Sequence, residues 1–419
     1  MDKNHRSLRA SAIALALSAG LAPTAWSADD VGALREQVDA LRQEVQALKA
    51  ALDEQRRQPG TADRPAPQTQ ATAPSSANQA GLPSDTDMQP RAAAHLAGYG
   101  AVGYASAKGG DSSFNMVQLA PIFHFAYGDR LFFETELNIT SNDAGGTNVD
   151  LEYANLNYFL NDHVALFAGK FLTPVGYFFQ NLHPAWINKF ASRPPGFGGE
   201  GSAAPESDIG VGARGGFALG DTARANYAVY VGNGPRLALN AAGDEIEAIE
   251  GEAATSNPSR HKLLAGRFAV LPIPGLELGV SLGASRLAVQ RDDGTVEARR
   301  SYQVAGADFA FRRKALELRG EYIQQRVGDL ASSVAPEGGT WKAGYVQAAY
   351  RITPQWEPVV RFGDFRSPHP DQRKRQWAAG VNYYVAPSAV AKLGFESNRG
   401  EAGTPNDSDR VLVQFAYGF

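Results

Sequence analysis

The sequence contains no cysteine among its 419 residues, and this absence removes several classes of chemistry. Without cysteine there is no thiolate nucleophile, no disulfide and no cysteine metal ligand, although an oxidising compartment remains compatible with the chain. Charge of one sign is not in large excess either, because 40 Lys and Arg stand against 44 Asp and Glu, for a formal net charge of −4. No strongly basic surface is implied, so nucleic acid is not expected as a partner.

Long apolar runs are also missing, since no segment reaches the roughly 18 uninterrupted apolar residues that a membrane-spanning helix needs. A shorter apolar run at about 10–22 follows three basic residues and precedes small residues. This order is typical of a secretory signal peptide. We therefore predict a signal peptide over residues 1–27, with cleavage near Ser27 or after Ala28, and no transmembrane helix in the mature chain.

Apolar residues in the segment 29–58 repeat at alternating spacings of three and four. They are Val31, Leu34, Val38, Leu41, Val45, Leu48 and Leu52. A narrow seam of this period between charged flanks favours a coiled-coil helix over a single amphipathic helix that lies on the protein. Valine alternating with leucine is compatible with a dimer and does not exclude a trimer.

The next segment, residues 59–94, has no aromatic residue and is rich in Pro, Ala, Ser, Gln and Thr. Such a composition buries too little apolar surface to offset the entropy of ordering the chain. We predict a disordered linker here, followed by a folded domain over residues 95–419.

Segments of alternating polarity, about ten residues long, fill the region from residue 95 to residue 419. Seven tight turns separate them at 126–129, 160–163, 219–222, 271–275, 312–314, 352–355 and 385–388. Eight longer polar stretches lie between these turns, at 107–113, 141–149, 171–207, 233–260, 290–299, 328–339, 365–374 and 399–408. Short turns at one end and long loops at the other join sixteen strands, which predicts an all-β, antiparallel transmembrane β-barrel.

Each strand has one apolar face and one polar face. In residues 131–140, Phe133, Thr135 and Leu137 alternate with Glu134 and Glu136. A soluble β-sandwich also alternates, but export and aromatic residues near strand ends favour a barrel whose apolar face meets lipid. The chain ends in an apolar strand at 410–419, and we expect that strand to close the barrel against the first one.

The expected architecture is similar to that of trimeric outer-membrane porins, and the stretch GKFLTPVGYFFQNLHPAWINKFASRPPGF from Gly169 resembles the phosphate-selective porin superfamily. The resemblance implies a homotrimer in the outer membrane of a Gram-negative bacterium, in contact with outer-membrane lipid and with its N-terminal extension in the periplasm. It also implies that loop 171–207 folds into the lumen as a constriction. The length of this loop is independent support, because long structureless excursions in compact domains are usually functional.

Charged residues opposite the apolar face are the candidate pore-lining residues. The basic ones are Arg214, Arg224, Arg267, Arg319, Arg361 and Lys392 on strands, Lys189 and Arg193 in the loop, and Lys170 at its entry, whose facing is ambiguous by one residue. The acidic ones are Glu134, Glu136, Glu277, Asp308, Glu317, Glu321, Glu357 and Glu396. Such charges set which ions pass a pore, or they neutralise one another across the wall.

Passive diffusion of small hydrophilic solutes is the expected function, with anions as the candidate class because guanidinium groups bind carboxylate and phosphate. The alternative is a structural tether, in which the coiled coil reaches cell-wall material and the barrel only anchors it. No HExxH motif accompanies the seven histidines, so we expect no enzyme, cofactor or metal site.

Overall fold

The computed structural model describes residues 92–419, apart from residues 111, 143, 200 and 292. The predicted signal peptide, the coiled coil at 29–58 and the linker up to residue 91 lie outside the described residues. No helix in the described part of the chain is long and apolar enough to cross a membrane.

Sixteen antiparallel strands form a closed barrel. They are β1 Ala92–Ala107, β2 Ser112–Tyr127, β3 Leu131–Ser141, β4 Thr147–Asn161, β5 Val164–Leu172, β6 Ser207–Leu219, β7 Ala223–Gly232, β10 Leu263–Ile273, β11 Leu276–Leu287, β12 Arg300–Arg313, β13 Leu316–Val327, β14 Gly339–Tyr350, β15 Trp356–Arg366, β16 Lys374–Ala386, β17 Ala389–Arg399 and β18 Arg410–Gly418. The predicted closed antiparallel barrel and its sixteen strands are therefore confirmed.

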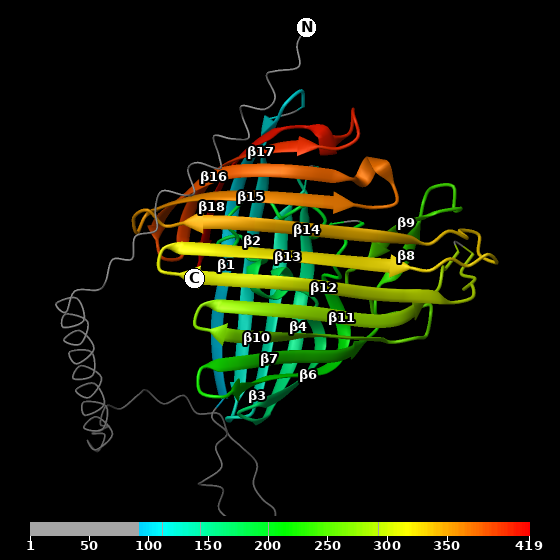
Figure 1. Cartoon of the computed structure of the whole chain (residues 1–419), viewed down its shortest axis with the longest axis horizontal. Coiled ribbons are helices and arrows are strands. Elements are labelled where there is room, and N and C mark those ends of the chain that lie inside the picture. The colour runs from blue at the N-terminus through cyan, green and yellow to red at the C-terminus, as the bar shows by residue number, and fades with distance from the viewer. Residues whose placement is uncertain (1–91, 111, 143, 200, 292) are drawn as a thin grey trace, which may run out of the picture. The chain divides into compact units, whose positions relative to one another are not determined.

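The connections alternate as the sequence predicts, with a tight turn after each even-numbered expected strand and a longer loop after each odd one. Figure 1 shows the tight turns and the C-terminus at one end of the barrel and the long loops at the other. We call these the short-turn end and the long-loop end. The first strand begins at Ala92, three residues before the expected start of the barrel at His95.

The barrel closes between β1 and β18, where the last residue of the chain takes part in the pairing. Phe419 donates its backbone N–H to the Gly98 carbonyl at 2.9 Å, and Gly98 donates back to the Phe419 carbonyl at 3.0 Å. Val413 and Phe415 of β18 are exposed on the outer wall, while Gln414 is buried on the inner side. The expected closure by the terminal strand is confirmed.

One hairpin was not expected from the sequence. The long stretch at 233–260 contains β8 (Arg236–Leu239) and β9 (Ile246–Glu250), which pair with each other outside the barrel sheet. The hairpin lies among the long loops (Figure 1), and Ile249 is fully buried in the main hydrophobic cluster. Within the described residues the helices are short: α3 (Phe178–Leu182), η1 (Pro370–Gln372) and η2 (Pro405–Asp407).

Candidate pore lining

Residues 173–206 connect β5 to β6, and we call them the inward loop. Apart from residue 200, which is not described, the loop packs against the inner side of the barrel wall. Two backbone N–H groups fix its first part, because Gly176 donates to Ser281 Oγ of β11 and Phe178 donates to Glu321 Oε2 of β13, both at 2.9 Å. Gly176 has φ +82°, and a Cβ added there would lie 1.8 Å from Glu321 Oε1. Glycine is therefore needed at this close approach to the wall.

Aromatic packing holds the middle of the inward loop against the inner wall. Phe178, Phe179 and Phe197 are each 1% exposed, and the ring of Phe197 meets that of Tyr345 of β14 edge-on at 5.2 Å. Edge-on aromatic pairs add to the burial of apolar area. Part of the lumen is thus a hydrophobic core and not a water-filled passage.

Lys189 of the inward loop is bound to the wall. Its Nζ donates to both carboxylate oxygens of Glu357 at 3.0 Å and to the Tyr384 hydroxyl at 3.2 Å, and it lies 3.8 Å from Glu317. The side chain is only 10% exposed. Lys189 therefore anchors the loop to the wall, and its charge is only partly available to a solute in the lumen.

Two cations of the barrel wall donate hydrogen bonds to the same loop. Lys392 of β17 donates to the carbonyl oxygens of Ala185 and Asn188, while Arg361 of β15 donates to the Ser192 carbonyl and hydroxyl at 3.0 and 2.7 Å. Both side chains are buried. Their donors are used for loop positioning, so the expected passage lining at Lys392 and Arg361 is instead a scaffold.

Arg193 keeps more exposure than the other cations of the inward loop. Its side chain is 38% exposed and pairs with Glu206 at 2.6 Å. Burial lowers the pKa of Arg193, but Glu206, and further away Glu152 of β4, outweigh it and raise the pKa above its ordinary value. Opposite charges therefore face each other where the loop comes near the β4 wall.

Arg267 and Arg319 are neutralised by neighbours on the wall. Arg267 forms ion pairs with Asp308 at 2.5 Å and Glu277 at 2.9 Å, and Arg319 pairs with Glu317 at 2.7 Å. The alternative in which opposite charges compensate one another across the wall is thus realised at these positions.

The remaining predicted residues lie on β3, β6 and β7. Arg214 donates to Asn157 at 2.8 Å and lies 3.8 Å from Glu134, whereas Arg224 is exposed and forms no ion pair with a residue that the structure describes. Glu136 is fully buried and accepts a hydrogen bond from Tyr99 at 2.8 Å. Arg214 and Arg267 also line a hollow of about 360 Å³ at the short-turn end.

Lys170 does not line the lumen, and its inclusion among the pore residues is corrected here. Leu166 on the same strand is exposed and Phe171 is buried, so the alternation of β5 places Lys170 on the outer face. Its Nζ donates to the Leu151 carbonyl at 2.5 Å. The one-residue ambiguity in the sequence is thereby resolved in favour of the outer wall.

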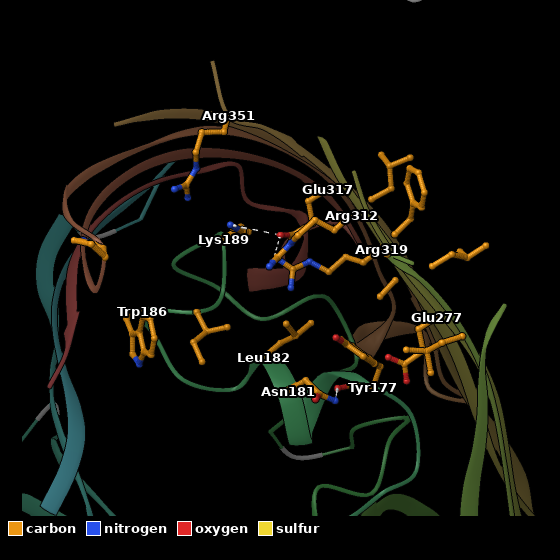
Figure 2. Close-up of a pocket in the computed structure, with 18 of the residues that line it drawn as sticks. Tyr177, Asn181, Leu182, Trp186, Lys189, Glu277, Arg312, Glu317, Arg319 and Arg351 are labelled. Carbon is orange, nitrogen blue, oxygen red and sulfur yellow. Dashed lines mark hydrogen bonds and ion pairs between the residues drawn. The ribbon is translucent and has the colours of Figure 1, made fainter. Parts of the chain in front are cut away.

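A larger hollow of about 640 Å³ lies beside the inward loop at the short-turn end; we call it the vestibule. Its charged lining residues are Lys189, Arg312, Arg319 and Arg351, with Glu277 and Glu317. Figure 2 shows Lys189, Arg312 and Arg319 around Glu317 and Arg351 further from it, with Tyr177, Leu182 and Trp186 of the inward loop on the facing side. Four cations and two carboxylates leave the lining with a formal excess of two positive charges.

Three vestibule residues were missed by the sequence analysis. Arg312 pairs with Glu317 at 2.6 Å, and the Arg351 guanidinium lies 4.1 Å from the centre of the Tyr384 ring, which is a cation–π contact. Arg312 and Arg351 stand in or beside tight turns, where strand alternation no longer predicts the direction of a side chain. Tyr384 lies near the end of β16, where the sequence predicts aromatic residues but not their contacts.

The comparisons with known proteins agree with this architecture. Residues 290–419 match the family model described as phosphate-selective porin O and P. The solved structures of similar fold include the anion-selective porin from Comamonas acidovorans, at 13% identity and a TM-score of 0.53, covering 78% of this chain and 100% of that chain. This chain has the fold of an outer-membrane porin. The match confirms a resemblance to the phosphate-selective porin superfamily over residues 290–419. The stretch from Gly169 lies outside the matched range, and the coiled coil lies outside the described residues.

Two further solved structures have a similar fold. The outer-membrane channel DcaP of Acinetobacter baumannii is 12% identical with a TM-score of 0.52, and Salmonella typhi OmpF in complex with daunomycin is 15% identical with a TM-score of 0.52. Each alignment covers 78% of this chain and 97% of the other. No curated protein matches the chain in sequence.

Proposed function

We propose that this porin lets small hydrophilic solutes diffuse passively across the outer membrane, with a preference for solutes that carry a carboxylate or phosphate. The vestibule is the observation that carries the proposal, because four cations, Lys189, Arg312, Arg319 and Arg351, line it with two carboxylates. A third carboxylate, Glu357, pairs with Lys189 and Arg351. Guanidinium groups offer carboxylate and phosphate paired hydrogen bonds.

The preference is expected to be modest. Glu357 lies behind Lys189 and takes up part of its charge, and Arg193 is paired with Glu206. Glu136 adds a carboxylate on the β3 wall. Conduction requires that the pore bind a solute weakly enough to release it. Cations that are already paired with carboxylates bind a passing anion weakly.

Reversal potentials in planar bilayers under a salt gradient test the proposal. Arg312→Gln with Arg351→Gln should shift the reversal potential toward cation preference, because these two side chains are 74% and 40% exposed in the vestibule. Arg313→Gln is the matched control, since Arg313 follows Arg312 but alternates to the outer face. An unchanged reversal potential in the double variant, or an equal shift in the control, would contradict the assigned site.

Orientation and assembly are part of the same proposal. Short turns of bacterial barrels face the periplasm, so the vestibule opens there and the N-terminal extension starts on that side. We propose a homotrimer in contact with outer-membrane lipid, on the family resemblance. The native mass of the assembled full chain should be three times the mass of one chain. The variant Leu41→Asp with Leu48→Asp tests whether the heptad seam contributes to trimer formation. Open-channel steps would distinguish the porin from the tether alternative.

A further inference from the structure

The outer wall carries a row of cations near the long-loop end, which we call the cationic rim. Its members are Arg286, Arg326, Lys342, Arg366, Arg375 and Arg399, near the long-loop ends of β11, β13, β14, β15, β16 and β17. The alternation of each strand places them outward, in line with exposed apolar residues such as Val346 and Trp377. Charged side chains on a lipid-facing wall are costly unless they reach a polar partner at the interface.

Like charges oppose one another directly within the rim. Lys342 is in register with Arg366, and Arg375 is in register with Arg399. Such pairs are destabilising when they are left alone. Asp364 offsets part of the charge, at 2.7 Å from Arg366 and 3.2 Å from Arg375.

The carboxylates near the rim do not balance it. Asp364 is the one strand carboxylate of β11–β18 that points outward, and Asp409 pairs with Arg399 at 2.9 Å. Six cations against these two carboxylates leave a formal excess of four positive charges. Lys342 forms no ion pair with any residue that the structure describes. The rim is therefore complementary to an anion.

A hollow of about 630 Å³ opens at the rim. Its charged lining residues are Arg366, Arg373, Lys374, Arg375 and Arg399, with Asp364 and Glu401. The Arg373 guanidinium is held by the carbonyl oxygens of Ser367 and Pro368 at 2.9 and 3.0 Å. Five cations and two carboxylates are arranged around one space large enough for a phosphate group.

An apolar groove of about 670 Å³ leads to the same place. It shares Asp364 and Arg366 with the hollow. Its apolar lining residues on the outer face include Leu278, Ala307, Phe309, Tyr322, Val346 and Phe362. Gly344 is in register with Tyr322 and with Asp364, and the missing side chain leaves space between them. Lys342 stands two residues further along β14, about 7 Å toward the rim.

We propose that the groove and the cationic rim bind one phosphorylated membrane lipid. An acyl chain would occupy the apolar groove, and the phosphate would lie against Lys342, Arg366 and Arg375. The two parts match an amphiphile. A free phosphate ion would make no contact with the apolar groove, and a neutral lipid would not neutralise the cations. Bound phosphate would also relieve the repulsion between Lys342 and Arg366.

Native mass spectrometry of the full chain in detergent micelles tests this site. The probes are phosphatidic acid and phosphatidylcholine with the same acyl chains, and inorganic phosphate as competitor. We expect the chain to retain phosphatidic acid in preference to phosphatidylcholine. The triple variant Lys342→Gln, Arg366→Gln, Arg375→Gln should retain roughly tenfold less phosphatidic acid, or less still, because it loses the attraction of several cations to one anionic headgroup. Arg313→Gln, an outward cation at the other end of the wall, should bind like the native chain.

A second variant separates the acyl chain from the charge. Gly344→Leu fills the groove without changing charge, and its Cβ would meet the Tyr322 ring at 3.4 Å, which the barrel can accommodate. This variant should also lose phosphatidic acid. Equal retention of the two lipids, full retention by the triple variant, or displacement by inorganic phosphate at concentrations equal to those of the lipid would overturn the proposal.

Discussion

Lys189 Nζ lies 3.0 Å from each carboxylate oxygen of Glu357, although 168 residues separate the two in the sequence. The contact ties the inward loop to β15, and both side chains are nearly buried. A buried pair of this kind positions a loop more than it stabilises a fold, because desolvation offsets much of the attraction.

Removing one partner of this pair should be costly. Lys189→Met leaves the buried Glu357 with Arg351 at 3.5 Å, and Glu357→Gln leaves Lys189 with Glu317 at 3.8 Å. Each change removes the shortest ion pair of a buried charge and should lower the free energy of unfolding by up to about 3 kcal/mol. The double variant should lose less than the sum of the two. Urea unfolding in detergent, followed by circular dichroism, measures all three. Arg224→Met serves as control because Arg224 forms no ion pair with a described residue, and strictly additive losses would show that the pair does not couple the loop to the wall.

Gly176 offers a test of how closely the loop approaches the wall. Gly176→Ala should displace the first turn of the inward loop, because the new Cβ would fall 1.8 Å from Glu321 Oε1. Gly199→Ala is matched to it, with a similar positive φ of +85° and no atom within 4 Å. Both changes carry the strain of a positive φ, on the order of 1 kcal/mol. A larger loss of stability for Gly176→Ala isolates the clash, and equal losses would contradict the placement of the loop.

The architecture was predictable from the sequence because barrel strands alternate with a period of two and end at recognisable turns. All seven tight turns were located this way, and the apolar strand at 410–419 predicted the closure. The facing of Lys170 was not predictable, because one residue of uncertainty in the register moves a side chain to the other face.

The contacts of the inward loop were also beyond the sequence. Which wall residue meets Lys189 or Arg193 depends on how a long segment crosses the lumen, and no local pattern encodes that path. The hairpin β8–β9 was hidden for a similar reason, since its short strands lie within a stretch that is mostly polar.

A pH response is expected at the long-loop end. Glu297 accepts hydrogen bonds from Arg291 at 2.8 Å and from the Val334 backbone at 3.1 Å, and it also bonds the Ser333 hydroxyl, so it joins two loops. Burial raises the pKa of Glu297, but the bonds to Ser333, Arg291 and Val334 outweigh it and hold the pKa below its ordinary value. A depressed pKa stabilises the folded loops above the unfolded pKa, and this stability is lost as pH falls through the folded pKa.

Hydrogen exchange at the Val334 amide measures that response. After correction for the intrinsic rate, protection should be high near neutral pH and fall as the pH drops below the ordinary pKa of a glutamate. Glu297→Gln should weaken protection at neutral pH and remove the pH dependence. A native chain whose Val334 protection does not change with pH would contradict the assignment.

The end of the chain can be tested by separating side chain from backbone. Deleting Phe419 removes both hydrogen bonds to Gly98, whereas Phe419→Ala keeps them. We expect the deletion to lower the yield of closed barrel more than the substitution does, because β1 and β18 lose a backbone pair at the seam. The fraction that resists unfolding in detergent gels without heating reports the yield. Equal yields would mean that the aromatic ring, and not the pairing, matters for closure.

Single-channel recording of the full chain and of a chain lacking residues 180–200 tests the central claim most directly. The structure places those residues inside the barrel, held by Glu357, Lys392 and Arg361. We predict discrete conductance steps for the full chain and larger steps for the deletion, because the lumen is widened when the inward loop is shortened. Absence of steps from the full chain, or an unchanged conductance after the deletion, would contradict a porin whose passage is narrowed by this loop.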